Sequence, residues 1–349
     1  ALERGDGGLL YNLGTFSTGG LGSGAGLGDQ FAFAFDDVTE RFFVVNAGDD
    51  TISMMQLLNS DGSLHTLDLV DAGGVDPVSI TVKNGLVFVV NAGDSANGVA
   101  ANIRGFTIGD YALEPIAGAN LPLSAASPAP AAIQFSPDGA HLVVSEKATN
   151  VLDVYNVDAN GAVTGPNVQA SAGATPFGFV FNDAGVLLVS EAFGGAANVS
   201  AVSSYTIAAD GTLTPVTRSL STQQTAACWM AAVGPYTWAA NAGSNNVTGY
   251  LVDADGTLSL LDSDGVSGTT GNTPLDEAVS SDGAFLYVID GGSHALSTIA
   301  IAADGSLTAP PDVAIPATAI GVVARGRRRR DRTGACSPSS VRLRPRPRV

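Results

Sequence analysis

The chain has 349 residues, of which 33 are acidic and 16 are basic, so its formal net charge is −17. Nine of the 16 basic residues follow Arg325, which leaves residues 1–325 with seven basic and 32 acidic side chains and a net charge of −25. Such an acidic body repels phosphate backbones and anionic lipid headgroups, which argues against nucleic-acid binding and membrane attachment.

No apolar run reaches the roughly 18 residues that a membrane helix needs, and no signal-type stretch precedes Ala1. The start therefore has the character of a processed or truncated end. We expect a monomeric protein that is extracellular or periplasmic, with a cytoplasmic location as the alternative.

A short apolar strand that ends in a polar turn recurs along the chain from Phe42 to His294. The polar residues of this repeat are separated by 45, 54, 45, 51 and 49 residues, which is a period typical of β-propeller blades. They are Asn46, Asn91, Ser145, Ser190, Asn241 and Asp290.

Each repeat continues with an alternating strand, such as Val151–Val157, and then an Asp-Gly or Asn-Gly turn, such as Asp210-Gly211. Glycine supplies the positive φ that such tight turns need. Each unit is therefore predicted to contain four antiparallel strands, and residues 1–325 are predicted to form one all-β domain, a β-propeller.

Six units are complete, and both ends of the domain resemble pieces of a seventh blade. Gly5–Gly14 resembles a turn and an outer strand, and Pro316–Ala324 resembles an inner strand. We therefore predict seven four-stranded blades with an incomplete terminal one, whose missing strands we expect upstream in the natural gene. A six-bladed propeller with frayed ends is the alternative.

Residues 326–349 form an Arg-rich tail without apolar periodicity. It is interpreted either as an arm for polyanions or for the acidic body, or as a disordered or non-native extension. The abrupt end of the repeat at Arg325 favours the second interpretation.

Most catalytic motifs are absent from the sequence. There is no G-x-S-x-G elbow and no C-x-x-C, H-E-x-x-H or EF-hand spacing. The glycine-rich run Gly19–Gly28 opens no helix, so it is predicted to be a loop between blades.

The polar ends of the second strands are expected at one mouth of the central channel. There a carboxylate could activate water, and a cation could stabilise an oxyanion. The alternative is that these short polar side chains only satisfy backbone groups in turns. The catalytic candidates are Glu191, Glu146, Lys147 and His294. The substrate-binding candidates are Phe193, Trp229 and Asn241, and the candidate ligands of a metal, for which Ca²⁺ is considered, are Asn46, Asn91 and Asp290.

Several segments resemble the seven-bladed lactonase family, which includes bacterial 6-phosphogluconolactonases and fungal carboxy-muconate lactonising enzymes. The resemblance extends from Asp6 to Arg325. The segments that carry it most clearly are Phe135–Asn150, Gly173–Phe181, Ser190–Gly195, Ala201–Val216 and Gln224–Trp229. It implies the propeller fold and hydrolysis of a lactone.

The family places a His on one inner strand, an Arg-His pair on the next, and a Glu at the end of that blade's second strand. The corresponding stretches Ala129–Gly139 and Ala174–Phe181 contain no His and no Arg, and only Glu191 matches. The family's mechanism therefore does not carry over intact.

The shortage of cations disfavours an anionic substrate. We therefore expect a neutral lactone, either an N-acyl-homoserine lactone as in quorum quenching or an unphosphorylated sugar lactone. The alternative function is a non-enzymatic propeller that binds a protein or a carbohydrate.

Overall fold

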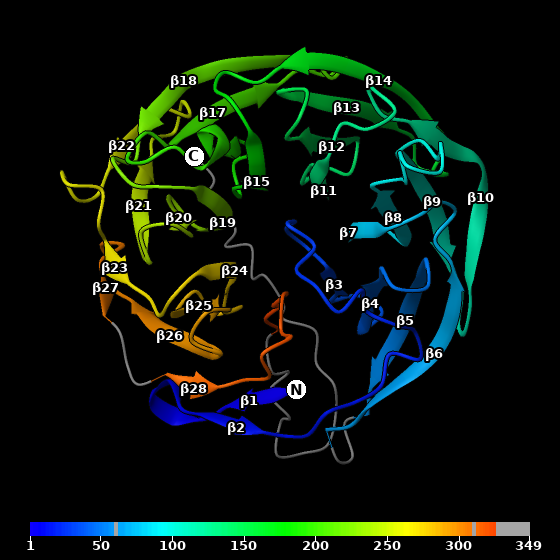
Figure 1. The fold of residues 1–349 in the computed structure, drawn as a ribbon, viewed down its shortest axis with the longest axis horizontal. Helices are drawn as coiled ribbons and strands as arrows, with labels where there is room; N and C mark the ends of the chain where they lie inside the picture. Colours follow the sequence, from blue (N-terminus) through cyan, green and yellow to red (C-terminus); the bar gives the residue numbers. More distant parts are fainter. Residues whose placement is uncertain (59–61, 309–311, 326–349) are drawn as a thin grey trace, which may run out of the picture.

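The structure is a computed structural model that describes residues 1–58, 62–308 and 312–325, so the predicted tail lies outside the described residues. In these ranges the chain forms strands β1 to β28 and no α-helix. Six antiparallel sheets follow one another around a central axis, each with its first strand innermost (Figure 1). The predicted β-propeller with an incomplete seventh blade is confirmed. No helix among these residues has the length and apolar character to span a membrane.

The first three blades each follow the order inner, second, third and outer strand. Blade 1 comprises β3 (Phe33–Asp36), β4 (Arg41–Asn46), β5 (Thr51–Leu57) and β6 (Leu64–Asp71). Blade 2 comprises β7 (Pro77–Lys83), β8 (Leu86–Asn91), β9 (Asn102–Ile108) and β10 (Leu113–Pro122). Blade 3 comprises β11 (Pro130–Phe135), β12 (His141–Glu146), β13 (Val151–Val157) and β14 (Val163–Ala170).

The next three blades keep the same plan, but the outer strand is split in two of them. Blade 4 comprises β15 (Pro176–Phe181), β16 (Leu187–Glu191), β17 (Ala201–Ile207) and β18 (Leu213–Ser221). Blade 5 comprises β19 (Ala227–Val233), β20 (Tyr236–Asn241), β21 (Asn246–Val252), β22 (Leu258–Leu260) and β23 (Gly268–Thr269). Blade 6 comprises β24 (Pro274–Val279), β25 (Phe285–Asp290), β26 (Ala295–Ile301), β27 (Leu307–Thr308) and β28 (Val313–Ala314).

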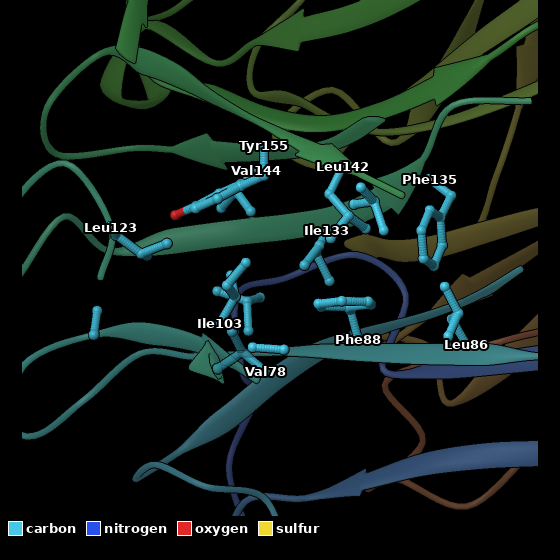
Figure 2. Packing of buried hydrophobic residues seen from close by; sticks show 14 residues of the cluster. Val78, Leu86, Phe88, Ile103, Leu123, Ile133, Phe135, Leu142, Val144 and Tyr155 are labelled. Carbon is cyan, nitrogen blue, oxygen red and sulfur yellow. The ribbon is translucent and has the colours of Figure 1, made fainter. Parts of the chain in front are cut away.

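The hydrophobic core lies between neighbouring blades rather than in one central mass. Figure 2 shows the cluster between blades 2 and 3, where Phe88 of β8 packs edge-on against Phe135 of β11 with ring centroids 5.6 Å apart. The inner and second strands are apolar on both faces because each face is covered by an adjacent blade. This explains their nearly continuous apolar sequences.

The gap between blades 6 and 1 holds both ends of the described chain. A hairpin of β1 (Leu2–Arg4) and β2 (Leu10–Asn12) packs beside blade 6 (Figure 1). From the C-terminal segment, Val322 packs against blade 6 and the adjacent Val323 against blade 1. The gap is therefore bridged by side chains from both ends.

The expectation of an inner strand over Pro316–Ala324 was wrong. This segment forms no strand. Its main tie to blade 6 is the backbone N–H of Val322, which donates to Asp276 Oδ2 at 2.8 Å. A buried side chain thus takes the place of a regular ladder of backbone hydrogen bonds.

Candidate active site

The last residue of each second strand occupies the same structural position in all six blades, and we call this residue the anchor. In blades 3 and 4 the anchors are Glu146 and Glu191, one residue later than the sequence repeat suggested. Ser145 and Ser190 lie on the opposite face of their strands, because adjacent side chains in a strand alternate. All six anchors are buried, with exposed fractions of at most 3%. They are Asn46, Asn91, Glu146, Glu191, Asn241 and Asp290.

The two glutamate anchors accept hydrogen bonds from nearby side chains and backbone with both of their oxygens. Glu191 accepts hydrogen bonds from Ser203 Oγ at 2.5 Å and from Ser219 Oγ at 2.6 Å. Glu146 accepts from the N–H of Ser124 at 3.0 Å and also from Ser124 Oγ and a neighbouring threonine hydroxyl. Burial raises the pKa of Glu191, and the serine hydroxyls oppose this rise. The predicted roles of both residues as general bases stay predictions, but neither carboxylate faces solvent.

The other anchors likewise bond to neighbouring strands or to the connection that leads into their blade. Asn46 Nδ2 donates to Ser53 Oγ at 2.8 Å, and Asp290 accepts from a serine hydroxyl. Asn91 Nδ2 donates to the carbonyl oxygen of Ala72 at 3.1 Å. The three predicted metal ligands are thus each engaged in a different blade. In the described part of the chain no three His, Cys, Asp or Glu side chains come together in a way that could hold a metal ion.

The remaining predicted site residues lie in different surroundings. His294 is exposed in the turn between β25 and β26, and its carbonyl accepts a backbone bond from Ile315. Phe193 is half-buried just after β16. Trp229 is buried on β19, with its ring centroid 5.2 Å from that of Phe177.

The position after the anchor identifies Lys147 as an exception to the repeat. In blades 2 to 6 the backbone N–H at this position donates to the residue that precedes the inner strand, so these positions are equivalent. A residue that breaks an otherwise uniform repeat has no role in the shared architecture, which makes it a candidate for function. The other blades have Ala47, Ala92, Ala192, Ala242 and Gly291 there.

The residue before the inner strand identifies Asp76 in the same way. At this position blades 2 to 6 have φ between 54° and 57°. Because this left-handed conformation recurs, it belongs to the blade's turn geometry rather than to strain at one site. Asp76 is the charged member of the set, whose other members are Ala129, Thr175, Ala226 and Thr273.

The segment of residues 22–30 lies beside these departures from the repeat, and we call it the plug. Residues 22–30 have no counterpart in the other blade connections, and they pass from the surface into the centre of the propeller (Figure 1). The Gln30 N–H donates to Ala131 of β11, its Nε2 donates to Met230 of β19, and its carbonyl accepts from Ser79 of β7. Strands of three different blades can form hydrogen bonds with one residue only if that residue lies near the central axis of the propeller.

The plug also explains a glycine on the inner strand of blade 4. A methyl group at Gly178 would stand 2.1 Å from Gln30 Oε1 and 2.5 Å from the Cys228 carbonyl oxygen. The backbone of Cys228, together with the side chain of Gln30, therefore leaves room only for glycine at this position. The predicted loop over Gly19–Gly28 is confirmed as a connection, and its continuation closes the channel.

Lys147 lies against the plug. Its Nζ donates to the carbonyl oxygen of Gly28, and it lies 5.0 Å from the centroid of the Phe177 ring. At the next residue of the plug, Trp229 Nε1 donates to the Asp29 carbonyl oxygen at 2.6 Å. A cation, two aromatic rings and a buried carboxylate thus meet at one mouth of the channel.

The titratable groups at this mouth change one another's pKa values. Burial lowers the pKa of Lys147, and Asp29, Cys228 and Asp76 oppose this shift. Burial, and then repulsion from Asp50, raises the pKa of Asp76. The pKa of Asp29 is raised well above its usual value, first by burial, and its Oδ2 has no hydrogen-bond partner within the described residues. Perturbed acids and bases of this kind cluster at functional sites.

Comparison with known proteins supports the resemblance seen in the sequence. Residues 116–228, which run from β10 to β19 and include Lys147, match the family described as Lactonase, 7-bladed beta-propeller. The chain is therefore similar to the seven-bladed lactonases over this stretch. No match is found among curated proteins.

Solved structures show the same fold at low identity. A protein from Lactobacillus plantarum is 20% identical, with a TM-score of 0.69 over 90% of this chain and 91% of its own. The periplasmic gluconolactonase of Pseudomonas aeruginosa is 19% identical, with a TM-score of 0.64 over 82% of this chain and 85% of its own. These likenesses establish the architecture alone.

Sequence reasoning found Lys147 but missed Asp29, Gln30, Asp76 and Phe177. Asp76 could have been found by aligning the residues before each inner strand, since it is charged where four other blades have small or neutral residues. The plug offered a weaker signal, namely an insertion in one connection.

Proposed function

We propose that the protein hydrolyses a neutral lactone at this channel mouth. Lys147 holds the carbonyl oxygen of the substrate, and Asp76 is the general base. One observation carries the proposal: Lys147 replaces an alanine or glycine of the repeat, and its ammonium group already binds a carbonyl oxygen, that of Gly28. The lactone carbonyl takes the place of this backbone oxygen.

The reaction follows from the two side chains. Asp76 takes a proton from water, and the resulting hydroxide attacks the ring carbonyl carbon. The charge on the carbonyl oxygen of the tetrahedral intermediate is stabilised by the Lys147 ammonium. The bond from the acyl carbon to the ring oxygen then breaks, and Asp76 returns the proton to that oxygen. The product is a hydroxy acid, which ionises to a hydroxy carboxylate.

The shifted pKa values set the pH range in which these roles are possible. A raised pKa makes Asp76 a stronger base than an ordinary aspartate. Because its pKa is lowered, Lys147 loses its proton at a lower pH than an ordinary lysine does. The acidic limb of the rate profile is therefore expected above the usual aspartate value, and the alkaline limb below the usual lysine value.

The charges around the mouth favour a neutral substrate. Asp29 and Asp76 both act on Lys147, and Asp50 acts on Asp76, so acidic groups outnumber the cation among these described residues. A phosphorylated lactone needs several cations and would be repelled here. N-acyl-homoserine lactones and unphosphorylated sugar lactones meet this requirement.

The test is pH-stat titration of the acid released from N-hexanoyl-homoserine lactone and from gluconolactone. Asp76→Asn is expected to lower kcat by roughly 10²- to 10⁴-fold, because it removes the base. Glu191→Gln and Glu146→Gln test the glutamate bases suggested by the sequence, and we expect smaller losses in correctly folded protein. EDTA followed by added Ca²⁺ tests the calcium hypothesis.

Full activity in Asp76→Asn with a large loss in either glutamine variant would move the base to a glutamate. No acid release from any lactone would move the protein to the class of binding propellers.

A further inference from the structure

Blade 2 departs from the repeat at a second place, on its third strand β9. In each blade, one residue of the third strand pairs in register with the residue two positions before the anchor. In blade 2 this residue is Arg104. In the other blades it is a small residue beside the anchor: Ser53, Asp153, Ser203, Thr248 and Ser297.

The arginine changes the hydrogen bonding of the anchor in its blade. In blade 1, the anchor Asn46 donates to Ser53, and in blade 5 Asn241 donates to Thr248. Blade 2 has Arg104 in place of this hydroxyl, and Asn91 Nδ2 donates instead to the carbonyl oxygen of Ala72 at 3.1 Å. Arg104 therefore does not take the part in anchor bonding that Ser53 and Thr248 take, which makes it a candidate for a separate role.

Arg104 opens onto a cleft between blades 1 and 2. Its aliphatic stem packs beneath Gly73, where an added Cβ would stand 2.6 Å from Arg104 Cγ. Its guanidinium lies 5.8 Å from the centroid of the Phe106 ring. Within residues 1–58, 62–308 and 312–325 the guanidinium forms neither a hydrogen bond nor an ion pair, so its N–H groups are available.

The cleft owes its shape to the outer strand of blade 2. The register of β10 against β9 shifts between Pro115 and Asn120, so this part of β10 departs from regular pairing. The cleft beside it has a volume of about 550 Å³, within the range of small-molecule sites. Its walls are Val70, Asp71, Gly73, Arg104, Phe106, Leu113, Pro115 and Asn120.

We propose that this cleft binds an α-amino acid with an apolar side chain. The ligand carboxylate pairs with Arg104, whose planar guanidinium can donate two parallel hydrogen bonds. The ligand ammonium pairs with Asp71, whose Oδ1 also accepts the Gly73 N–H at 2.7 Å. The apolar side chain packs on the hydrophobic walls, which include Val70 and Leu113.

The charges of the molecule favour a zwitterion over a simple acid. A carboxylate alone would be repelled by Asp71 and by the acidic body. An amine alone would be repelled by Arg104. An amino acid has no net charge and satisfies both side chains, so it is the ligand for which the cleft's two opposite charges are arranged.

The experiment is isothermal titration calorimetry of the full chain with L-leucine, 4-methylpentanoate and 3-methylbutylamine. Leucine is expected to bind saturably, and both analogues, which lack one charged group each, are expected to bind at least tenfold more weakly. Arg104→Gln should weaken leucine binding at least tenfold. Arg218→Gln removes an exposed cation of blade 4 and is the matched control, for which no change is expected.

Asp71→Asn separates the two charges. It keeps the Oδ1 acceptor of the turn but removes the partner of the ammonium, so the preference for leucine over 4-methylpentanoate should disappear. Arg104→Lys provides a second test if the glutamine variant unfolds, because it keeps the charge and loses the paired donors. No saturable binding of leucine to the unmodified chain by about 10 mM, or equal binding in the folded Arg104 variants, would overturn the proposal.

Discussion

Blade 3 and blade 5 share one strand plan but differ in chemistry at the end of the second strand. In blade 5 the anchor Asn241 donates to Asn246 Oδ1 at 2.8 Å and to Thr248 Oγ1 at 2.9 Å, and Ala242 follows it. All of these groups are neutral. Blade 5 therefore shows what the repeat needs for its own stability.

Blade 3 carries a buried pair of acids at the same place. The N–H of Ser124 donates both to Glu146 and to Asp153 Oδ2, and Asp153 Oδ1 has no partner within the described residues. Burial, and then Glu146, raises the pKa of Asp153 to about 8. The comparison shows that the blade with the functional candidate Lys147 buries two carboxyl groups where blade 5 has neutral side chains.

The largest expected effect is on activity. Lys147→Ala removes the group that stabilises the oxyanion, so kcat/KM for the lactone should fall by roughly 10²- to 10³-fold, with little change in melting temperature. The measurement is steady-state kinetics together with thermal melting.

The double variant Lys147→Ala, Ala242→Lys places the cation at the equivalent position of blade 5. It should not recover activity, because it is the ammonium at position 147 of blade 3 that contacts Gly28 and interacts with Asp76. Recovery would mean that the position in the ring does not matter and would contradict the proposed site.

The acid pair of blade 3 predicts pH-dependent stability. The folded chain holds a proton on Asp153 that the unfolded chain loses near pH 3.8, so stability should fall as pH rises from about 4 to about 8. Asp153→Asn cannot ionise and should raise the free energy of unfolding at pH 8 by on the order of 3 kcal/mol relative to the unmodified chain. Urea melts at pH 5 and pH 8 measure the slope.

Asp183→Asn, which removes an exposed carboxylate, is the control for charge. It should leave the slope unchanged. Equal slopes in the Asp153 variant and the unmodified chain would show that Asp153 is ionised throughout this range.

Introducing an acidic side chain into blade 5 should lower the stability of the protein. Asn241→Asp loses two donated hydrogen bonds and places a carboxylate beside Asn246 Oδ1, so the free energy of unfolding at pH 7 should fall by about 2 kcal/mol. Chemical denaturation measures this value. Asn84→Asp, at an exposed asparagine, should have almost no effect.

The smallest expected effect concerns the ring beneath Lys147. Phe177→Leu removes the cation–π contact, so the ammonium is less stabilised and its pKa should fall further. The alkaline limb of the kcat profile should move to lower pH by about 0.5 unit. Phe181→Leu, on the same strand, should leave the limb in place.

The sequence was sufficient for the blade plan. Apolar strands covered on both faces and turns such as Asp210-Gly211, where Gly211 has a φ of 83°, are local features that each unit repeats. The sequence also singled out Lys147, since a lysine after a strand end is conspicuous in a chain with so few cations. Six complete blades and an incomplete seventh follow from these signals alone.

Tertiary structure decided which polar side chains reach the channel mouth. A shift of one residue turned Glu146 and Glu191, rather than the preceding serines, into buried anchors, because strand side chains alternate and the sequence repeat does not fix the register. The sequence showed the plug only as an insertion in one connection and did not show where it lies, since Gln30 bonds with Met230 at a separation of 200 residues. A contact of this kind exists only after the blades close into a ring, so no local pattern of residues encodes it.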